Sequence, residues 1–102
     1  MPLRIHDMES DLRRLLDLIK RECPTLYSKI YDDDVKDYID NNEFGLAFEL
    51  LTYRGVSYID QLPRNVLGGI GQIIRAYDMH TFSKNQKINE RYDRFQRAIY
   101  EK

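Results

Sequence analysis

Apolar side chains recur at helical spacing along most of the chain, and this periodicity limits the fold more than any other feature of the sequence. The first such run occupies i, i+3, i+4 and i+7 with Leu12, Leu15, Leu16 and Ile19. This spacing places the side chains on one face of an α-helix, so the sequence predicts a helix over residues 8–22. No segment has the sustained alternation of a β-strand. The one candidate, residues 56–59, is too short to build a sheet alone.

Proline, asparagine and acidic residues mark the ends of two further short helices. Pro24 ends the first helix, and residues 26–30 are expected to form a short helical turn beyond it. The acids Asp32–Asp34 stand where carboxylates cap and favour a helix N-terminus, so the next helix should follow them. Asn41 and Asn42 then indicate its end.

The second half of the chain predicts three longer helices. The first opens at Glu43, and Gly55 is expected to be a left-handed cap just past its end. The expected inward face of this helix consists of Leu46, Ala47, Leu50 and Tyr53. Asp60 and Pro63 mark the start of the next helix, which runs to about residue 78. After a break at residues 79–83, the last helix has four inward positions, Ile88, Tyr92, Phe95 and Ile99.

These segments predict an all-α fold, with residues 1–102 forming a single domain. The expected architecture is a compact bundle of five or six helices, some of them short. The chain has 102 residues, of which 42% are apolar and 32% charged, which is enough for one hydrophobic core. The formal net charge of −1 argues against binding nucleic acid by bulk electrostatics.

Cysteine usage and hydropathy indicate a cytoplasmic protein with no membrane segment. Cys23 is the only cysteine, which excludes an internal disulfide and fits a reducing compartment. No apolar run reaches the length of a membrane span, and the first ten residues lack the apolar core of a signal peptide.

No group of residues is typical of catalysis, of a metal site or of a cofactor site. His6, His80 and Cys23 cannot by themselves make a usual structural zinc site. The acidic region fails the strict positions of a calcium loop in both registers that approach its spacing. We therefore expect that the protein is not an enzyme and that it binds no metal ion and no cofactor.

Three glycines in the run GGIGQII need a separate explanation. Gly68, Gly69 and Gly71 superficially resemble a phosphate-binding loop, but no strand precedes them and no lysine follows. Glycine inside a helix costs roughly 1 kcal/mol relative to alanine. The run therefore indicates either a close approach between helices or a helix that begins near Ile70.

Charge is distributed unevenly along the chain. Residues 31–50 hold seven acids and one base, whereas residues 84–102 hold six bases and three acids. Asp33, Asp37 and Asp40 recur at i, i+4 and i+7, opposite the apolar positions of their helix. They are expected in water, either as an ordinary solvated face or as an acidic stripe for a basic partner.

The stretch DYIDNNEFGLAFELL resembles the MafI-type immunity proteins, which are small bacterial antitoxins, and short signatures of contact-dependent growth inhibition (CdiI-like) immunity proteins. The shared pattern is Tyr38-Ile39-Asp40, then Glu43, then Leu46-Ala47-Phe48-Glu49-Leu50. This resemblance covers about 15 residues. It implies a bacterial cytoplasmic protein that binds and neutralises the toxic C-terminal domain of a polymorphic toxin, often a nuclease, by covering its active site or substrate groove.

A nuclease that holds phosphate has a basic surface, so the acids are the expected contacts with such a partner. Tyrosines in or near loops are good interface anchors, because they bury much area with few torsions. The predicted partner-binding residues are Asp32, Asp33, Asp34, Asp37, Asp40, Tyr27, Tyr31 and Tyr58.

Several alternatives stay open at the level of sequence. Phe44, Phe48 and Leu51 form a second apolar stripe on the helix that opens at Glu43, so this helix is either nearly enclosed, the preferred interpretation, or half exposed at an interface. The alternative function is a nucleic-acid-associated adaptor that uses the basic last helix, with Lys84, Lys87, Arg91, Arg94 and Arg97. An uncharacterised enzyme is a third. The free protein is compatible with a monomer or a homodimer.

Overall fold

A computed structural model describes residues 7–101 as an all-α fold. Residues 1–6, including His6, and residue 102 lie outside the described residues. The elements in chain order are α1 (Asp7–Glu22), α2 (Pro24–Ile30), α3 (Asp33–Asp40), α4 (Phe44–Gly55), the 3-10 helix η1 (Val56–Gln61), α5 (Arg64–Ala76), α6 (Met79–Ser83) and α7 (Gln86–Glu101). The all-α bundle predicted from the sequence is confirmed.

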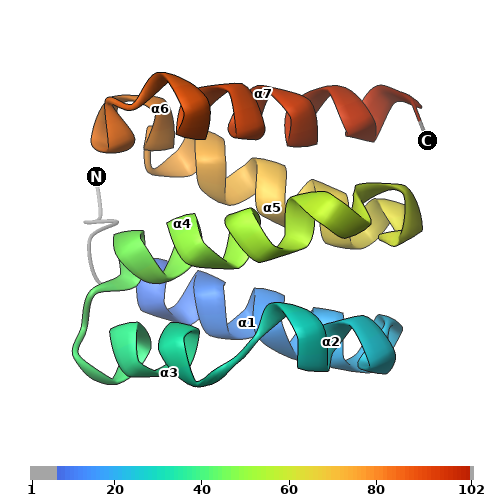
Figure 1. The fold of residues 1–102 in the computed structure, drawn as a ribbon, viewed down its shortest axis with the longest axis horizontal. Coiled ribbons are helices and arrows are strands. Elements are labelled where there is room, and N and C mark those ends of the chain that lie inside the picture. The colour runs from blue at the N-terminus through green and yellow to red at the C-terminus, as the bar shows by residue number, and fades with distance from the viewer. Residues whose placement is uncertain (1–6, 102) are drawn as a thin grey trace.

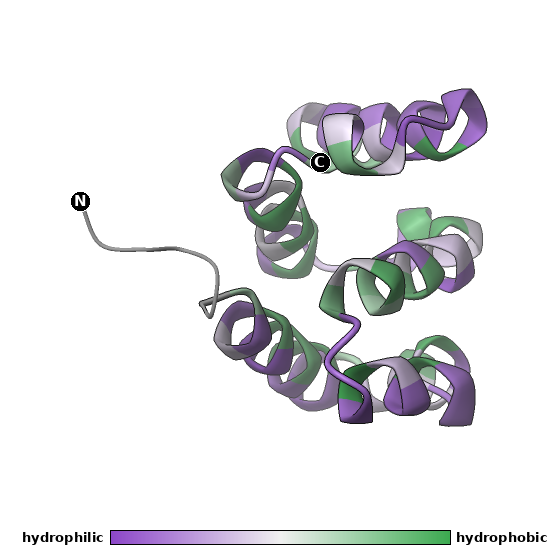
Figure 2. Cartoon of the chain, turned by 90° about the vertical axis from the view of Figure 1, so that its left-hand side faces the viewer, coloured by the Kyte–Doolittle hydropathy of each residue, from purple (hydrophilic) through white to green (hydrophobic). Residues whose placement is uncertain are grey.

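The helices form two layers with α7 across one end (Figure 1). α3 and α4 run antiparallel in the front layer, and α1 and α5 lie behind them. α7 packs on α5 and also contacts α4, so that α4 lies between α3 and α7. Viewed from the side, the hydrophobic faces of the helices point inward toward one core (Figure 2).

Capping chemistry fixes the start of α3 where the sequence predicts it. A carboxylate oxygen of Asp32 accepts hydrogen bonds from the backbone N–H groups of Asp34 and Val35, both at 3.1 Å. These bonds satisfy two of the backbone donors that the first turn of a helix leaves without partners. Asn42, in the turn that follows α3, adopts a positive φ of 62°.

The core consists of the apolar positions that the periodicity selects, with contributions from every helix. The largest side chains that are fully buried are Tyr92, Phe48 and Phe95. Phe48 of α4 and Tyr92 of α7 lie with ring centroids 5.8 Å apart. This aromatic pair joins the front layer to α7.

The glycines of α5 lie inside a helix that begins at Arg64, so the interpretation of a helix starting near Ile70 is wrong. A Cβ atom at Gly69 would lie 3.1 Å from Cδ1 of Leu15 in α1. A Cβ atom at Gly71 would lie 2.8 Å from Cδ1 of Ile99 in α7. The two glycines therefore let α5 approach both neighbours closely.

Two local expectations are wrong, and one, that residues 56–59 build no sheet, is confirmed. Gly55 is not a left-handed cap: it has right-handed φ/ψ values of −76° and −24°, because the chain continues from α4 directly into η1. Residues 56–59, the strand candidate, belong to that 3-10 helix. The break expected at residues 79–83 is instead helix α6, bounded by Asp78 and Lys84 with positive φ values of 51° and 55°.

Candidate functional site

The outward face of α4 carries an apolar stripe that is partly exposed. Leu46 is 37% exposed and Tyr53 is 58% exposed, and Leu50 between them is half-buried. These three residues, at i, i+4 and i+7, are called the apolar stripe below. The expectation that Leu46 and Tyr53 face the core is therefore wrong, whereas Leu50 packs against the core as expected.

The buried face of α4 is the second stripe that the sequence contains. Phe48 and Leu51 are fully buried, as is Ala47 between the two stripes. Both sides of α4 are apolar, so periodicity alone cannot tell which side meets the core. The preferred interpretation of a nearly enclosed helix holds for most of α4, because only Leu46 and Tyr53 of its residues are exposed.

Acidic side chains border the apolar stripe along α3 and the turn after it. Asp34, Asp37 and Glu43 are exposed, and all three line a shallow hollow of about 420 Å³ between α3 and α4, together with Leu50. We call these three carboxylates the acidic stripe. Within the described residues, neither Asp37 nor Glu43 forms an ion pair.

Basic side chains border the apolar stripe on the other side, along α7. Arg91 donates a hydrogen bond to the backbone oxygen of Glu49 at 3.0 Å, and its guanidinium lies 5.2 Å from the ring centroid of Tyr53. Lys87 and Arg94 lie at i−4 and i+3 from Arg91, on the same side of α7. These three residues are called the basic stripe.

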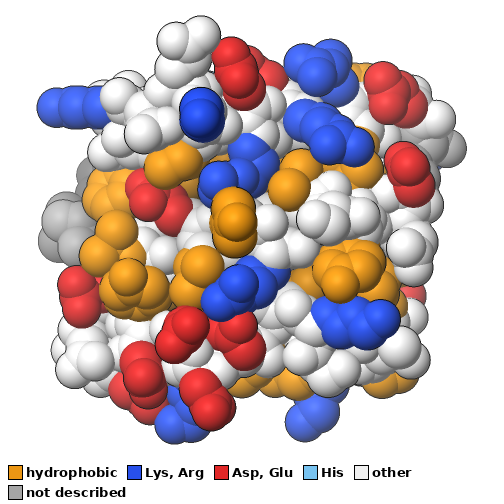
Figure 3. Space-filling model, viewed as in Figure 1, with side chains coloured by type: hydrophobic (Ala, Val, Ile, Leu, Met, Phe, Trp, Pro, Cys, Tyr) orange, Lys and Arg blue, Asp and Glu red, His pale blue; other side chains and the backbone are white. Residues whose placement is uncertain are grey.

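The acidic, apolar and basic stripes together make one face of the molecule, called the three-stripe face below. Figure 3 shows red side chains gathered over α3, orange ones across α4, and blue ones with some red ones among them over α7. A second hollow, of about 210 Å³, separates α4 from α7 and has Leu46, Tyr53 and Ile88 among its lining residues. Large apolar groups exposed beside charged ones are typical of protein-binding surfaces.

Three of the five predicted acids are occupied within the chain. Asp32 caps α3 and pairs with Arg54, whose Nε lies 2.6 Å from Oδ2 of Asp32. Arg54 also lies 3.4 Å from Asp34, which remains exposed. Lys36 donates to Asp40 at 2.8 Å, and this hydrogen bond raises the pKa of Lys36.

The predicted acids of α3 differ in whether they line the hollow between α3 and α4. Asp33 and Asp40 lie at i−3 and i+4 from Lys36, and neither lines the hollow beside α4. Asp34 and Asp37 line the hollow beside α4. All of Asp33, Asp37 and Asp40 are exposed, as expected, but only Asp37 belongs to the three-stripe face.

The predicted tyrosine contacts lie outside this face and are partly buried. Tyr27 and Tyr31 stack on each other with ring centroids 5.3 Å apart. Burial, followed by the nearby Tyr31 and Asp17, raises the pKa of Tyr27. Tyr58 lies under Lys29, whose Nζ is 5.7 Å from the ring centroid. None of the three lines either hollow beside α4.

A polar cluster holds α6 against α4 and α7, and its Glu49 also lines the hollow between α4 and α7. The hydroxyl of Ser83 donates to a carboxylate oxygen of Glu49 at 2.6 Å and lies 3.4 Å from the hydroxyl of Tyr92. Burial, followed by the carboxylate of Glu49, raises the pKa of Tyr92 to about 12. The cluster therefore fixes three helices with groups that stay protonated or paired at neutral pH.

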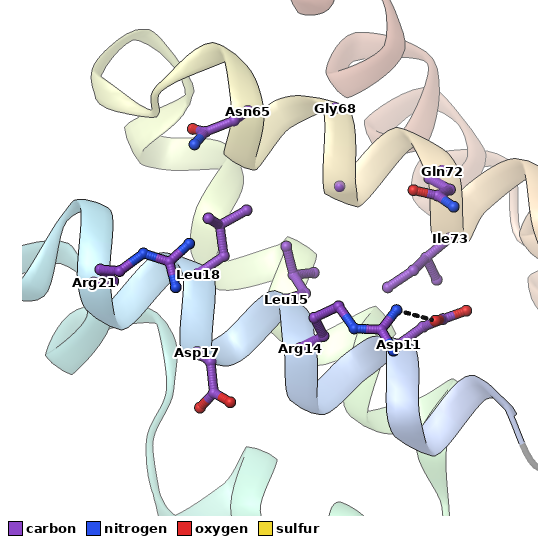
Figure 4. Close-up of a pocket in the computed structure, with 11 residues that line it drawn as sticks. Asp11, Arg14, Leu15, Asp17, Leu18, Arg21, Asn65, Gly68, Gln72 and Ile73 are labelled. Carbon is purple, nitrogen blue, oxygen red and sulfur yellow. Dashed lines mark hydrogen bonds and ion pairs between the residues drawn. The ribbon is translucent and has the colours of Figure 1, made fainter.

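Another hollow lies on the other side of the molecule, between α1 and α5 (Figure 4), with a volume of about 550 Å³. Leu15, Leu18 and Ile73 provide its apolar lining. A Cβ atom at Gly68 would meet nothing within 4 Å, so this glycine leaves the hollow open. Arg14 at the rim is already paired with Asp11 at 3.2 Å.

Groups with potential for chemistry are dispersed over the molecule. No three His, Cys, Asp or Glu side chains in residues 8–101 gather closely enough to hold a metal ion. Burial, with a smaller effect from Glu22, raises the pKa of the Cys23 thiol, so less of it is the reactive thiolate at neutral pH. His80 lies 2.8 Å from Asp93 on the far side of α7 from the stripes. Across the described part of the chain, no helix combines the length and apolar character needed to cross a bilayer.

The chain matches no family model, no curated protein and no solved structure. The chemistry of its own surface is therefore what indicates a function.

Proposed function

We propose that this chain is a protein inhibitor that binds its partner through the three-stripe face, as an immunity protein binds the toxic C-terminal domain of a polymorphic toxin. The observation that carries the proposal is the exposure of Leu46 and Tyr53 between two charged borders. Exposing such side chains to water is unfavourable, and a partner that covers them gains roughly 25 cal/mol for each Å² of apolar surface buried.

The acidic stripe specifies the kind of partner. Asp37 and Glu43 are free of ion pairs among residues 7–101, and Asp34 is exposed beside them. Carboxylates on a rim attract a basic surface and speed its association. A nuclease domain, whose substrate surface must hold phosphate, has this property. The resemblance of the DYIDNNEFGLAFELL stretch to immunity proteins supports the same class of partner.

Rescue from killing tests the function itself. The probe is the C-terminal domain of a toxin encoded upstream of this chain, co-expressed with it in a sensitive bacterium. We expect survival with the chain and death without it. Death in both cases, with the chain present as folded protein, would contradict the proposal.

A matched pair of charge reversals tests the surface. Asp34→Lys with Asp37→Lys reverses two acids of the three-stripe face, whereas Asp33→Lys with Asp40→Lys makes the same change at two acids of α3 that do not line the hollow beside α4. We expect the first pair to weaken binding to the toxin domain by at least about tenfold, since two attractive contacts become repulsive. The second pair should retain most of the affinity. Equal effects would remove the acidic stripe from the interface.

A further inference from the structure

We infer that two copies of this chain pair through the three-stripe face, around a two-fold axis that runs parallel to α4. This pairing would cover the apolar stripe when no partner is bound. The order of the three stripes carries the inference, because a face with an acidic border, an apolar centre and a basic border is complementary to itself.

The symmetry follows from the position of α4 between α3 and α7. A two-fold axis lying in the interface along α4 turns each copy over onto the other and exchanges the two borders. The acidic stripe of one copy then meets the basic stripe of the other, twice in each dimer. The two apolar stripes meet at the axis. A two-fold axis perpendicular to α4 would instead set like charges against each other.

The positions of the charges along α4 also agree with this axis. A rotation about an axis parallel to α4 does not move a residue along the direction of α4, so two charges meet in the dimer only if they lie at the same height along that helix, called a level below. Near the end of α4, Asp34 lies beside Arg54, and the ring of Phe95 in α7 approaches Gly55. Arg94, next to Phe95, therefore lies level with Asp34. In the dimer these two residues face each other across the interface.

The middle and the start of α4 give the second and third levels. Asp37 lines the hollow beside Leu50, and Arg91 binds the backbone oxygen of Glu49, so these two charges share the middle level. Glu43 precedes the first turn of α4, and Ile88, next to Lys87 in α7, lines the same hollow as Leu46 of that turn. Three opposite-charge pairs are thus in register on each side of the axis.

The size of the face is sufficient for a specific dimer. The molecule measures 33 × 26 × 25 Å, and the three-stripe face is the broad one seen in Figures 1 and 3. Standard interfaces bury ~800 Å² per partner, so the pairing would use most of this face. Tyr53, held by the guanidinium of Arg91, supplies an aromatic anchor close to the axis.

One consequence rests on the proposed function. The basic stripe of a second copy offers the acidic stripe the same chemistry as a basic toxin surface. The second copy and the toxin domain would therefore compete, and the inhibitor would dissociate into single chains as it binds. The pairing itself involves only this chain, so it can be tested independently of the proposed function.

Sedimentation of the free protein tests the pairing. We expect a dimer at about 0.1 M salt that dissociates at about 1 M, where the Debye length falls from ~10 Å to ~3 Å. A chain that stays monomeric up to about 1 mM at the lower salt would overturn the inference. So would a dimer that does not weaken with salt.

Two variants give the sharpest test. The acid variant carries Asp34→Lys and Asp37→Lys, and the base variant carries Lys87→Glu and Arg94→Glu. Each variant alone should dimerise at least about tenfold more weakly, because both of its borders then have the same sign. Mixed in equal amounts, they should form a heterodimer, since each acidic border again meets a basic one.

The mixing result excludes a trivial loss of folding, because two unfolded variants cannot restore each other. Asp33→Lys with Asp40→Lys is the control and should dimerise like the unchanged protein. A mixture that stays monomeric overturns the inference, as does a control that loses the dimer equally. Loss of toxin rescue with the dimer intact would reject the proposed function alone.

Discussion

At the scale of single residues, the phenol of Tyr92 links stability to alkaline pH. Its side chain is fully buried, and burial raises its pKa from an ordinary 10.0 to about 12. Below pH 10 the phenol is protonated in both the folded and unfolded states, so it gives no pH dependence. Between pH 10 and 12 only the unfolded state releases the proton. We expect the free energy of unfolding to fall there by roughly 1.4 kcal/mol per pH unit.

Tyr92→Phe should remove most of that slope, because it deletes the titrating group and keeps the ring in place. Tyr100→Phe is the matched control, since the ring of Tyr100 is 86% exposed. Urea unfolding monitored by circular dichroism at several pH values measures the slope. An unchanged slope in Tyr92→Phe would mean that other groups set the alkaline limit.

Asp32 illustrates what sequence can and cannot predict for one residue. Its role as the cap of α3 follows from local chemistry and is confirmed by two hydrogen bonds. Its ion pair with Arg54 joins residues far apart in the chain, and nothing in the sequence announces it. The carboxylate of Asp32 already binds groups of its own chain and is less available to bind another protein. Asp32 is therefore a weaker candidate for partner contact than Asp37.

At the scale of elements, replacing glycine by alanine is expected to have different effects on stability at two positions of α5. Gly68→Ala adds a methyl group into open space and should stabilise the helix by about 0.5–1 kcal/mol. Gly71→Ala gains the same propensity but forces Cδ1 of Ile99 to move from 2.8 Å. We expect Gly68→Ala to be the more stable variant in urea unfolding. The reverse order would show that α5 and α7 separate easily.

Helix existence and boundaries were largely predictable, whereas the orientation of α4 was not. Caps and prolines act over a few residues, so the starts of α3 and α5 can be inferred locally. α4 has apolar side chains on both sides, and which side meets the core depends on where α3 and α7 lie. The same ambiguity hid the candidate site, because Leu46 and Tyr53 were expected inside. The stronger signal was the second stripe with Phe48 and Leu51, whose larger aromatic content favours the core.

At the scale of the whole molecule, the packing predicts one cooperative unfolding transition. α5 contacts both α1 and α7, so unfolding of α5 would expose the core on both sides of the bundle. Ile70 in α5 is 2% exposed, and Ile70→Ala should cost about 2–5 kcal/mol. We expect the unchanged protein and the Ile70→Ala variant each to lose helix content and aromatic signals together. The measurement is made at about 1 M salt to suppress pairing of two copies. Two separated transitions would contradict a shared core.

The three-stripe face is itself a whole-molecule feature. Its charges come from two segments that the sequence separates by some fifty residues, and only the fold sets them on either side of α4. The uneven charge of the chain was visible in the sequence. The spatial order of acid, apolar group and base required knowing that α4 lies between α3 and α7.

The central place of α5 also has a consequence for synthesis. α1 leaves the ribosome before α5, because the helix that covers its Leu15 side begins only at Arg64. At about 5–20 residues per second, that side of α1 waits on the order of 2–10 s for its cover. During this interval the nascent chain presents an apolar helix surface to its surroundings. Chaperones that sample emerging chains would therefore meet α1 before α5 can.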